Sequence, residues 1–488
     1  MTGARERLAR VFGIDPRALA ALRIGLAAIV LADLALRLSD FETFYTDAGL
    51  LPVGILPDRA REVLVPLHAF CGAPAWQAAL FAAAGIAAAL MLIGLFTRAA
   101  VVASFALMLS LHGRSAMVGD FGDEILRQLL FWCMFLPLGC RWSVDAWRRA
   151  APARRHPVLS LASAALLLQI ASIYFFTALL KDGPDWRRDG TAIEIVLQRD
   201  WALRPFGAFL LEHARGGLRA GTFAVLAFEF FGPLLLFSPF ATRLLRTLLV
   251  YLAWLFQGGL GLALLLGLMP FVNSVMMLAF LPASWWDAAA GLVRRTPRAA
   301  PGAPARARSR PPLALEVLVG LLLLLMLAVN VAGLREEWSL PEPLARAARL
   351  VGLQQRWAMF SPDAPRDDGW YTIPGELAGG HYVDLWSAGP ELTWRKPARL
   401  ADVHRSHRWY VYENRLREPA FGEEPSLRFR RRYGEWLCER WNAEHSGAEA
   451  LLRLGVFWVM EPTLGGGEPP PQVPHRLFEH ECAGERAP

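Results

Sequence analysis

Apolar residues along the chain gather into long uninterrupted blocks that polar segments separate. The blocks run from "ALAALRIGLAAIVLADLAL" near the N-terminus to "LALEVLVGLLLLLMLAVNVAGL" before residue 335. A helix needs about 20 apolar residues to cross the roughly 30 Å core of a bilayer. Since a soluble protein does not bury such runs in series, the pattern predicts an all-α polytopic membrane bundle. We count eight or nine transmembrane helices, because "LLVYLAWLFQGGLGLALLLGLMPFVNSVMMLAFLP" holds one span, or two hinged near Gly267 and Pro270.

A change of composition after Leu334 divides the chain. Residues 335–488 are mixed polar and aromatic, and "HYVDLW", "RWYVYE" and "VFWVME" have the composition of strands. "SLRFRRRYGEWLCERWN" predicts a helix. We therefore expect a transmembrane domain over residues 1–334 and a small α+β domain over 335–488. The basic Pro/Ala-rich segment 295–312 is predicted to be a mobile cytoplasmic linker, and "LGGGEPPPQVP" after Thr463 to be disordered.

The net charge of +7 follows the predicted membrane topology. Arginines cluster in alternate loops, for example at Arg154 and Arg308, whereas the opposite loops carry acidic residues such as Asp40 and Asp120. Under the positive-inside rule this distribution favours nine spans over eight. It predicts a multi-pass protein of the cell (inner) membrane, with a cytoplasmic N-terminus and an extracytoplasmic C-terminal domain. The same distribution accounts for the positive charge without nucleic-acid binding.

Four ionisable residues fall inside predicted spans: Arg23, Asp33, Arg127 and Glu229. Such residues either satisfy one another and fix helix packing, or line a polar cavity. Asp33 and Arg37 are spaced to pair on one helix face. Glu229 has no partner in its own helix, and Gly232 and Pro233 weaken that helix one turn further on.

Other chemical signatures are sparse. The sequence has no Walker loop, no glycine-rich dinucleotide fingerprint and no His-Glu-x-x-His zinc helix. His404 and His407 alone are weak evidence for a metal, so we expect none. Cys71, Cys438 and Cys482 fall on the predicted outer side, where an oxidising compartment permits a disulfide.

Lys181 ends an otherwise uncharged apolar helix, just before Asp182, Gly183 and Pro184. From the residues alone, the favoured interpretation is an anchor that extends to water, because lysines often end transmembrane helices. The alternative is a lysine kept at the membrane edge for chemistry.

Several stretches, in this order, resemble one known family. They are "RIGLAAIVLADLALRLSDFETFYTDAGLLP", "RWSVDAW", "YFFTALLKDGPDW" and "LQQRWAMFSPDAPRDDGWY". Over about residues 15–380 the chain is similar to the vitamin K-dependent gamma-carboxylases and their bacterial homologues, the horizontally transferred transmembrane (HTTM) domain proteins.

The resemblance implies a quinol-dependent lyase that carboxylates a protein or peptide glutamate. Lys181 matches the lysine that deprotonates vitamin K hydroquinone, and Asp185 and Trp186 match the pair that follows it. Reduced vitamin K or another membrane quinol is the implied cofactor, next to Tyr174, Phe175 and Glu229. The resemblance also pairs Cys71 with Cys438, with a bond between Cys438 and Cys482 as the alternative.

The chain departs from the carboxylases at two positions. Cys140 and Gln257 stand where carboxylases carry histidines. Carboxylation therefore competes with the hypothesis of a non-catalytic membrane scaffold or maturation partner, whose outer domain binds another protein. A transporter is disfavoured, because the sequence shows no two related halves.

Overall fold

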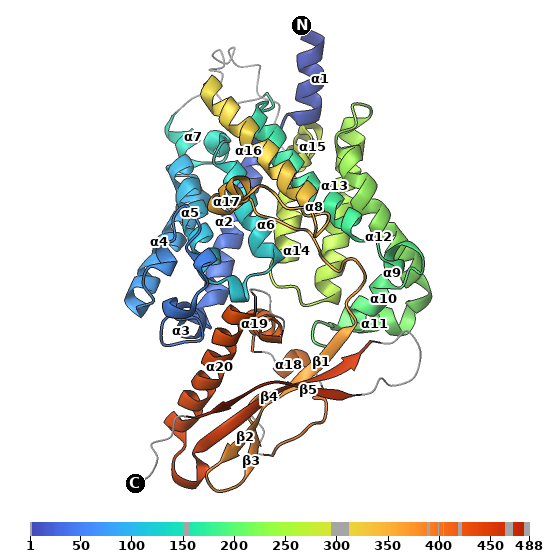
Figure 1. The fold of residues 1–488 in the computed structure, drawn as a ribbon. Coiled ribbons are helices and arrows are strands. Elements are labelled where there is room, and N and C mark those ends of the chain that lie inside the picture. The colour runs from blue at the N-terminus through green and yellow to red at the C-terminus, as the bar shows by residue number, and fades with distance from the viewer. Residues whose placement is uncertain are drawn as a thin grey trace.

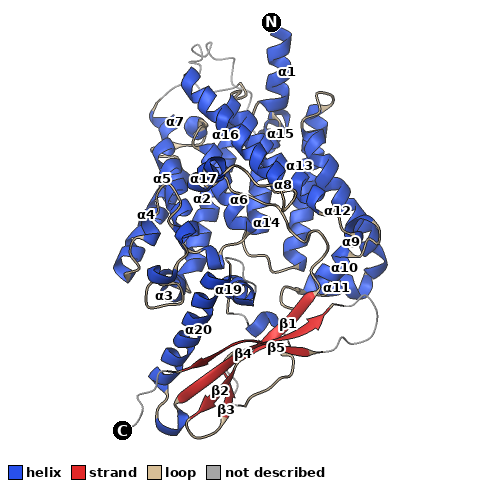
Figure 2. Cartoon of the chain, in the orientation of Figure 1, coloured by secondary structure: helices blue, strands red, loops and turns tan. Residues whose placement is uncertain are grey.

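The computed structural model describes residues 2–149, 156–293, 312–387, 391–398, 400–403, 405–417, 422–463 and 472–482. The predicted linker 295–312 lies outside these residues except for Pro312. The predicted disordered stretch 464–474 lies outside them up to residue 471, but its last residues, Val473 and Pro474, begin a strand and are not disordered. The chain forms a helical bundle with an antiparallel sheet at the end opposite the N-terminus (Figure 1). The sheet and its helices come from the C-terminal part of the chain (Figure 2).

Six helices are long and apolar enough to cross a membrane, by length and composition, so this is a multi-pass membrane protein. They are α2 (Pro16–Leu38), α4 (Pro74–Ile93), α8 (Leu161–Leu180), α12 (Arg215–Leu236), α13 (Thr242–Ala263) and α16 (Leu313–Ala332). The other helices of the bundle are α1 (Thr2–Phe12), α3 (Phe41–Tyr45), α5 (Thr97–Arg114), α6 (Phe121–Cys133), α7 (Val144–Arg148), α9 (Pro184–Arg187), α10 (Ala192–Leu197), α11 (Pro205–His213), α14 (Met269–Met276), α15 (Ala283–Val293) and α17 (Glu342–Leu350).

The described residues thus hold fewer helices that meet these criteria than the eight or nine spans predicted. The blocks "AAVVASFALMLSL" and "ILRQLLFWCMFLPLG" form α5 and α6, which are packed in the bundle but are more polar or shorter. The long block does break as expected. Helix α13 ends at Ala263, Gly267 adopts a φ of 56°, and α14 begins at Met269. Pro270 stands in the first turn of α14, where proline needs no backbone donor.

The sheet has five antiparallel strands around the long strand β4 (Leu451–Pro462). Strand β4 pairs with β1 (Asp367–Thr372), β2 (Pro374–Leu377) and β5 (Val473–Glu481), and β2 pairs with β3 (Tyr382–Asp384). The strands predicted from "HYVDLW" and "VFWVME" are confirmed as parts of β3 and β4. Helix α20 (Glu423–Glu444), predicted from "SLRFRRRYGEWLCERWN", contacts β4 and β5.

Two predictions for the C-terminal part are wrong. "RWYVYE" forms no strand but lies in helix α19 (His407–Arg417), next to the short α18 (Leu400–Val403). The buried residues Trp409, Tyr412 and Leu416 recur at helical spacing, and this longer pattern outweighs the local aromatic composition.

The second correction concerns the disulfide. Cys438 of α20 is bonded to Cys482, which follows β5, with a Cα–Cα distance of 5.5 Å. Cys71 is an exposed free thiol in the loop before α4. The bond therefore closes the C-terminal part on itself and does not tie it to the first loop. The local pairing forms because α20 contacts β5 directly, bringing the two cysteines together.

The bundle and the C-terminal part share one hydrophobic core. Buried residues of α19, α20 and β4 belong to the same cluster as those of α2, α5 and α6. Helix α19 lies between the bundle and the sheet (Figure 1). The segment that joins α17 to β1 runs back across the bundle, and this return places it beside the end of α8.

Candidate functional site

Lys181 is the C-terminal cap of α8, and its side chain turns into the protein. Helix α8 begins at a capping box of Ser160 and Ser163, and Pro184 opens α9 soon after it ends. The residue is only 3% exposed. Its Nζ lies 2.6 Å from Oε2 of Glu229 on α12 and 4.1 Å from the ring centroid of Trp186. The ammonium therefore does not extend to bulk water, as a lysine anchor would.

A mainly apolar cavity of about 260 Å³ opens beside this pair. Helices α8, α12 and α13 form its walls, together with parts of α10, α11 and α14. Its polar lining residues are Tyr174, Thr177, Lys181, Glu229, Gln257 and Asn273. Nε2 of Gln257 donates a hydrogen bond to the Tyr174 hydroxyl at 3.3 Å. Oε1 of Gln257 and Oδ1 of Asn273 are buried and have no hydrogen-bond donor within the part of the chain that the structure describes.

The predicted site residues divide into two groups. Lys181, Trp186, Tyr174 and Glu229 line the cavity. Phe175 is not among the lining residues, and its ring packs against Phe230 with the centroids 5.4 Å apart. A neighbour on a helix points about 100° away, so Tyr174 and Phe175 cannot both face the cavity.

Asp185 is also turned away from the cavity. Its Oδ1 accepts hydrogen bonds from Nη2 of Arg366 at 2.7 Å and from Oγ1 of Thr191 at 2.8 Å. Its backbone N–H donates to Oδ1 of Asp363 at 2.9 Å. The carboxylate thus fixes the turn that carries Trp186, and does not itself face the space beside Lys181.

Sequence reasoning missed the part that the segment before β1 plays in this site. Met359 and Phe360 line the cavity, and the indole N–H of Trp186 donates to the Phe360 carbonyl at 2.7 Å. The backbone N–H of Gly183 donates to the Pro362 carbonyl at 3.1 Å. The segment 359–366 therefore closes the end of the cavity and holds the Lys181 turn. The Pro- and Asp-rich "FSPDAPRDD" was the available signal, because such residues favour turns.

The residue type at position 181 is informative. Lys181 is one of only two lysines in the chain, the other being Lys396, whereas arginines are abundant. An arginine at this position would stay protonated under all ordinary conditions, but a buried lysine can release its proton. One of the two exceptions to the general use of arginine thus falls at a buried position in the wall of the cavity.

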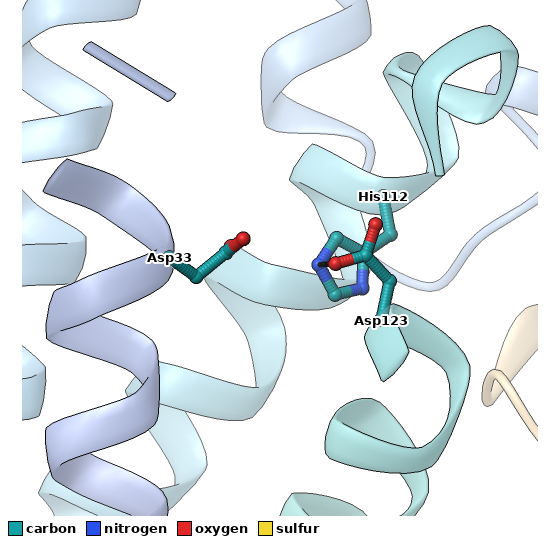
Figure 3. A group of neighbouring side chains, drawn as sticks. All are labelled: Asp33, His112 and Asp123. Carbon is teal, nitrogen blue, oxygen red and sulfur yellow. Dashed lines mark ion pairs between the residues drawn. The ribbon is translucent and has the colours of Figure 1, made fainter. Parts of the chain in front are cut away.

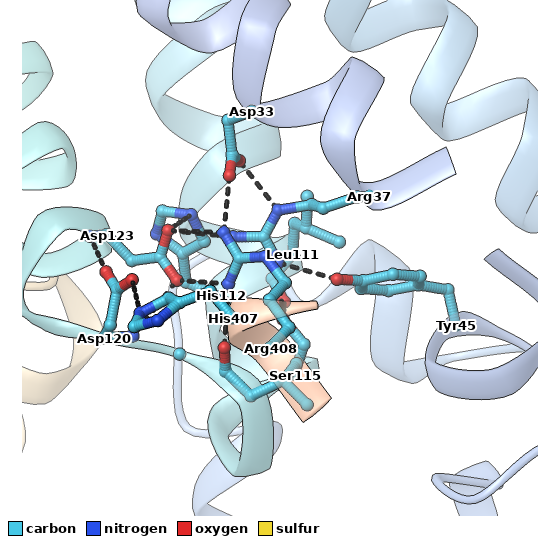
Figure 4. A network of polar contacts seen from close by, with 12 residues as sticks. Asp33, Arg37, Tyr45, Leu111, His112, Ser115, Asp120, Asp123, His407 and Arg408 are labelled. Atoms are coloured by element: carbon cyan, nitrogen blue, oxygen red, sulfur yellow. Dashed lines mark hydrogen bonds and ion pairs between the residues drawn. The ribbon is translucent and has the colours of Figure 1, made fainter. Parts of the chain in front are cut away.

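A second buried polar cluster links the bundle to α19. The predicted pair of Asp33 and Arg37 is confirmed, with Nε to Oδ2 at 2.7 Å. Arg37 also binds Asp123 at 2.9 Å, and Arg408 of α19 binds Asp33 and Asp123 (Figure 4). Burial disfavours the charged form of Arg408, but Asp123 and Asp33 outweigh it and hold its pKa above the ordinary value.

Three side chains of the same cluster lie close enough together to be ligands of one metal ion. One ligand atom each of Asp33, His112 and Asp123 lies within 4.8 Å of the others (Figure 3). Both carboxylates are already neutralised by the guanidiniums of Arg37 and Arg408 (Figure 4). The arrangement therefore supports the packing interpretation of the buried charges and not a metal centre.

Comparison with known proteins identifies the transmembrane part. The family model of the HTTM domain matches residues 13–285, which include α2 through α14 and all the cavity residues except Met359 and Phe360. A search of curated proteins and a search of solved structures each found no match.

Proposed function

Because the chain belongs to the HTTM-domain family, which includes homologues of vitamin K-dependent gamma-carboxylase, we propose that it is a membrane enzyme acting on a lipid quinol. In this proposal Lys181 is the base that removes a proton from a quinol hydroxyl. The observation that carries it is the Lys181–Glu229 pair in the wall of an apolar cavity.

The pair can supply a neutral amine without losing a proton to solvent. Charges are costly in an apolar site, so the neutral form of the pair becomes accessible there. The proton passes from Nζ of Lys181 to Oε2 of Glu229 across their 2.6 Å contact. Nζ then has a free lone pair and accepts the quinol proton, while Glu229 retains the first one. Trp186 and the segment 359–366 exclude water that would compete for this lone pair.

The cavity fits a quinol head group. Its volume of about 260 Å³ is slightly below the roughly 300 Å³ at which the range of ordinary ligand pockets begins. Its walls are mainly apolar, while Oε1 of Gln257 and Oδ1 of Asn273, which accept no hydrogen bond from the described residues, could accept one from a hydroxyl. When bound, reduced vitamin K or another membrane quinol would supply the reducing power, and its reaction with oxygen would supply the strong base that the gamma-carboxylase family uses.

The remaining parts of the proposal follow from family membership and charge. We propose that the carboxylated group is a glutamate of a protein or peptide. This substrate approaches from the side of the C-terminal part. Residues 1–334 and 335–488 are proposed as the two domains. The distribution of arginines supports a cytoplasmic N-terminus in the cell (inner) membrane, with the C-terminal part on the opposite side.

Adjacent glycines on α13 allow a direct test of the cavity. A Cβ at either Gly258 or Gly259 would meet no atom within 4 Å, but only Gly259 lines the cavity. We expect mass spectrometry of the purified protein to detect a bound quinone. Gly259→Leu should remove it, and Gly258→Leu should retain it. Equal amounts of quinone in the two variants would contradict the cavity as its site, and absence of quinone from the unaltered protein would favour the scaffold hypothesis.

A further inference from the structure

A groove that the proposed chemistry does not use lies where α16 ends. It has a volume of about 370 Å³ and is formed by the last turn of α16, the following turn and α17. Its apolar floor includes Val329, Ala332, Ala345 and Ala348. Its charged lining residues are Arg335, Glu336, Arg349 and Arg356, so cations predominate.

One of these arginines has no acidic partner among the residues that the structure describes. The Arg335 guanidinium lies over the Trp338 ring at 5.4 Å, but makes no ion pair or hydrogen bond with the rest of the described chain. Arg356 is paired with Glu336 at 3.3 Å, with both side chains well exposed. Exposed pairs of this kind contribute little free energy, so the Arg356 guanidinium can exchange its partner for a stronger anion. Arg349 is engaged with Glu62 and Glu342.

The groove continues a surface that must face lipid. Only 22% of the apolar window of α16 is buried inside the protein. Val317, Leu321, Leu324 and Val331 are exposed large apolar residues at helical spacing along it. This stripe ends beside the groove, where Trp338 is 48% exposed. Tryptophan is enriched where a membrane protein passes from hydrocarbon to head groups, so the groove lies where a lipid phosphate would be.

We propose that this groove binds one anionic phospholipid, with its acyl chains along the α16 stripe and its phosphate between Arg335 and Arg356. Charge complementarity carries the assignment. Arginine recognises phosphate through paired N–H donors, and the groove supplies one free guanidinium and one weakly paired. A zwitterionic lipid would bring its own cation to a lining that holds three arginines and one glutamate. The inference does not depend on the quinol chemistry.

The test uses the full chain in nanodiscs made from equal amounts of phosphatidylglycerol and phosphatidylcholine. Lipids that remain bound after transfer to detergent are identified by native mass spectrometry. We expect phosphatidylglycerol to be enriched over its share in the nanodisc, and the double variant Arg335→Gln with Arg356→Gln to lose this enrichment. The matched control is Arg346→Gln, which lies on α17 between the two substituted positions but outside the groove lining.

Each other outcome overturns the proposal. Absence of enrichment in the unaltered protein would mean that the groove does not select an anionic lipid. Equal loss of enrichment in Arg346→Gln would mean that the general positive charge of the surface retains the lipid, and not a specific site. Displacement of the retained lipid by inorganic phosphate alone would mean a soluble anion site. If the double variant does not fold, the single variant Arg335→Gln is used instead. Arg335 makes no polar bond with the described residues, so its replacement should not disturb folding. Full enrichment of phosphatidylglycerol in Arg335→Gln would overturn the assignment.

Discussion

Lys181 and Glu229 carry opposite charges 2.6 Å apart where their surroundings are otherwise mostly apolar. Taking two charges out of water costs free energy that their attraction only partly restores. The protein would therefore be at least as stable with two apolar side chains at these positions. The charged pair is therefore not explained by stability. It is explained by the proposed catalytic role, in which a proton moves between the Lys181 amine and the Glu229 carboxylate.

Removing one partner of this pair should destabilise the protein more than removing both. Glu229→Leu leaves a buried ammonium without its carboxylate, which costs about 3–5 kcal/mol when a buried pair is broken. Lys181→Met together with Glu229→Leu removes both charges and should restore most of the stability. Thermal unfolding of the purified variants in detergent checks this. A single variant as stable as the double variant would contradict the burial of a charged pair.

At the scale of elements, the site depends on the contact between two turns far apart in sequence. Gly183 lies so close to the segment 359–366 that a Cβ there would be 2.1 Å from Oδ1 of Asp363. The same Asp363 oxygen accepts the backbone N–H of Asp185. The segment that closes the cavity thus also holds the turn that carries Trp186.

Gly183→Ala should therefore disturb the site without preventing folding. The backbone conformation at Gly183 suits alanine, so the cost is the steric displacement of Asp363, about 1–3 kcal/mol. We expect lower quinol turnover, with part of it restored by adding Asp363→Gly. Gly216→Ala is the control, because a Cβ there meets no atom within 4 Å. Unchanged turnover in Gly183→Ala would mean that this contact does not position Trp186.

The disulfide gives a second test at this scale. Cys71 should react with a maleimide in the native protein, whereas Cys438 and Cys482 should react only after reduction. Reduction should also destabilise the C-terminal part by about 3–5 kcal/mol, since the bond closes a loop of moderate length. Peptide mapping by mass spectrometry identifies which cysteines have reacted with the maleimide and which are cross-linked. A cross-linked peptide containing Cys71 and Cys438 would contradict the bond between Cys438 and Cys482.

Elements with strong local patterns were predictable from the sequence, and contacts between distant segments were not. The break at Gly267, the helix α20 and the pair of Asp33 and Arg37 follow from residues near one another in the chain. Helix α19 was predicted as a strand, because its aromatic residues dominate a short window while its helical period needs a longer one. Six helices of the described residues meet the length and hydropathy criteria for spans, whereas eight or nine were predicted, because an apolar block does not reveal how far its helix extends.

The candidate site divides in the same way. Lys181 and Trp186 were found through a family resemblance, and Glu229 because a lone carboxylate in an apolar helix needs a partner. The outward turn of Asp185 and the closing segment 359–366 depend on Arg366 and Asp363, which lie far along the chain. No pattern within "KDGPDW" indicates those partners.

At the scale of the whole molecule, the two proposed domains are joined by both polar and apolar contacts. Arg408 of α19 binds both Asp33 of α2 and Asp123 of α6, and the hydrophobic core is continuous across the boundary. The segment 359–366, which lines the end of the cavity, leads directly into β1 of the C-terminal part. We therefore expect docking of this part and closure of the site to be coupled.

Arg408→Met should show how strongly this docking supports the fold. The change leaves two buried carboxylates with one guanidinium, and we expect a loss of about 3–5 kcal/mol. Arg431→Met is the control, because Arg431 is 79% exposed and pairs with Glu435 on the same helix. Thermal unfolding of both variants gives the comparison. Equal effects would mean that the cluster contributes no more than a surface pair.

The most direct test of the account is oxygen-dependent quinol consumption by the protein in nanodiscs, measured for Lys181→Arg. Arginine keeps the positive charge beside Glu229 but cannot release its proton. The matched control is Lys396→Arg, at the only other lysine, which pairs with Asp200 away from the cavity. We predict turnover in the unaltered protein and in Lys396→Arg, and none in Lys181→Arg, although that variant should still fold. Full turnover in Lys181→Arg would contradict the assignment of Lys181 as the base.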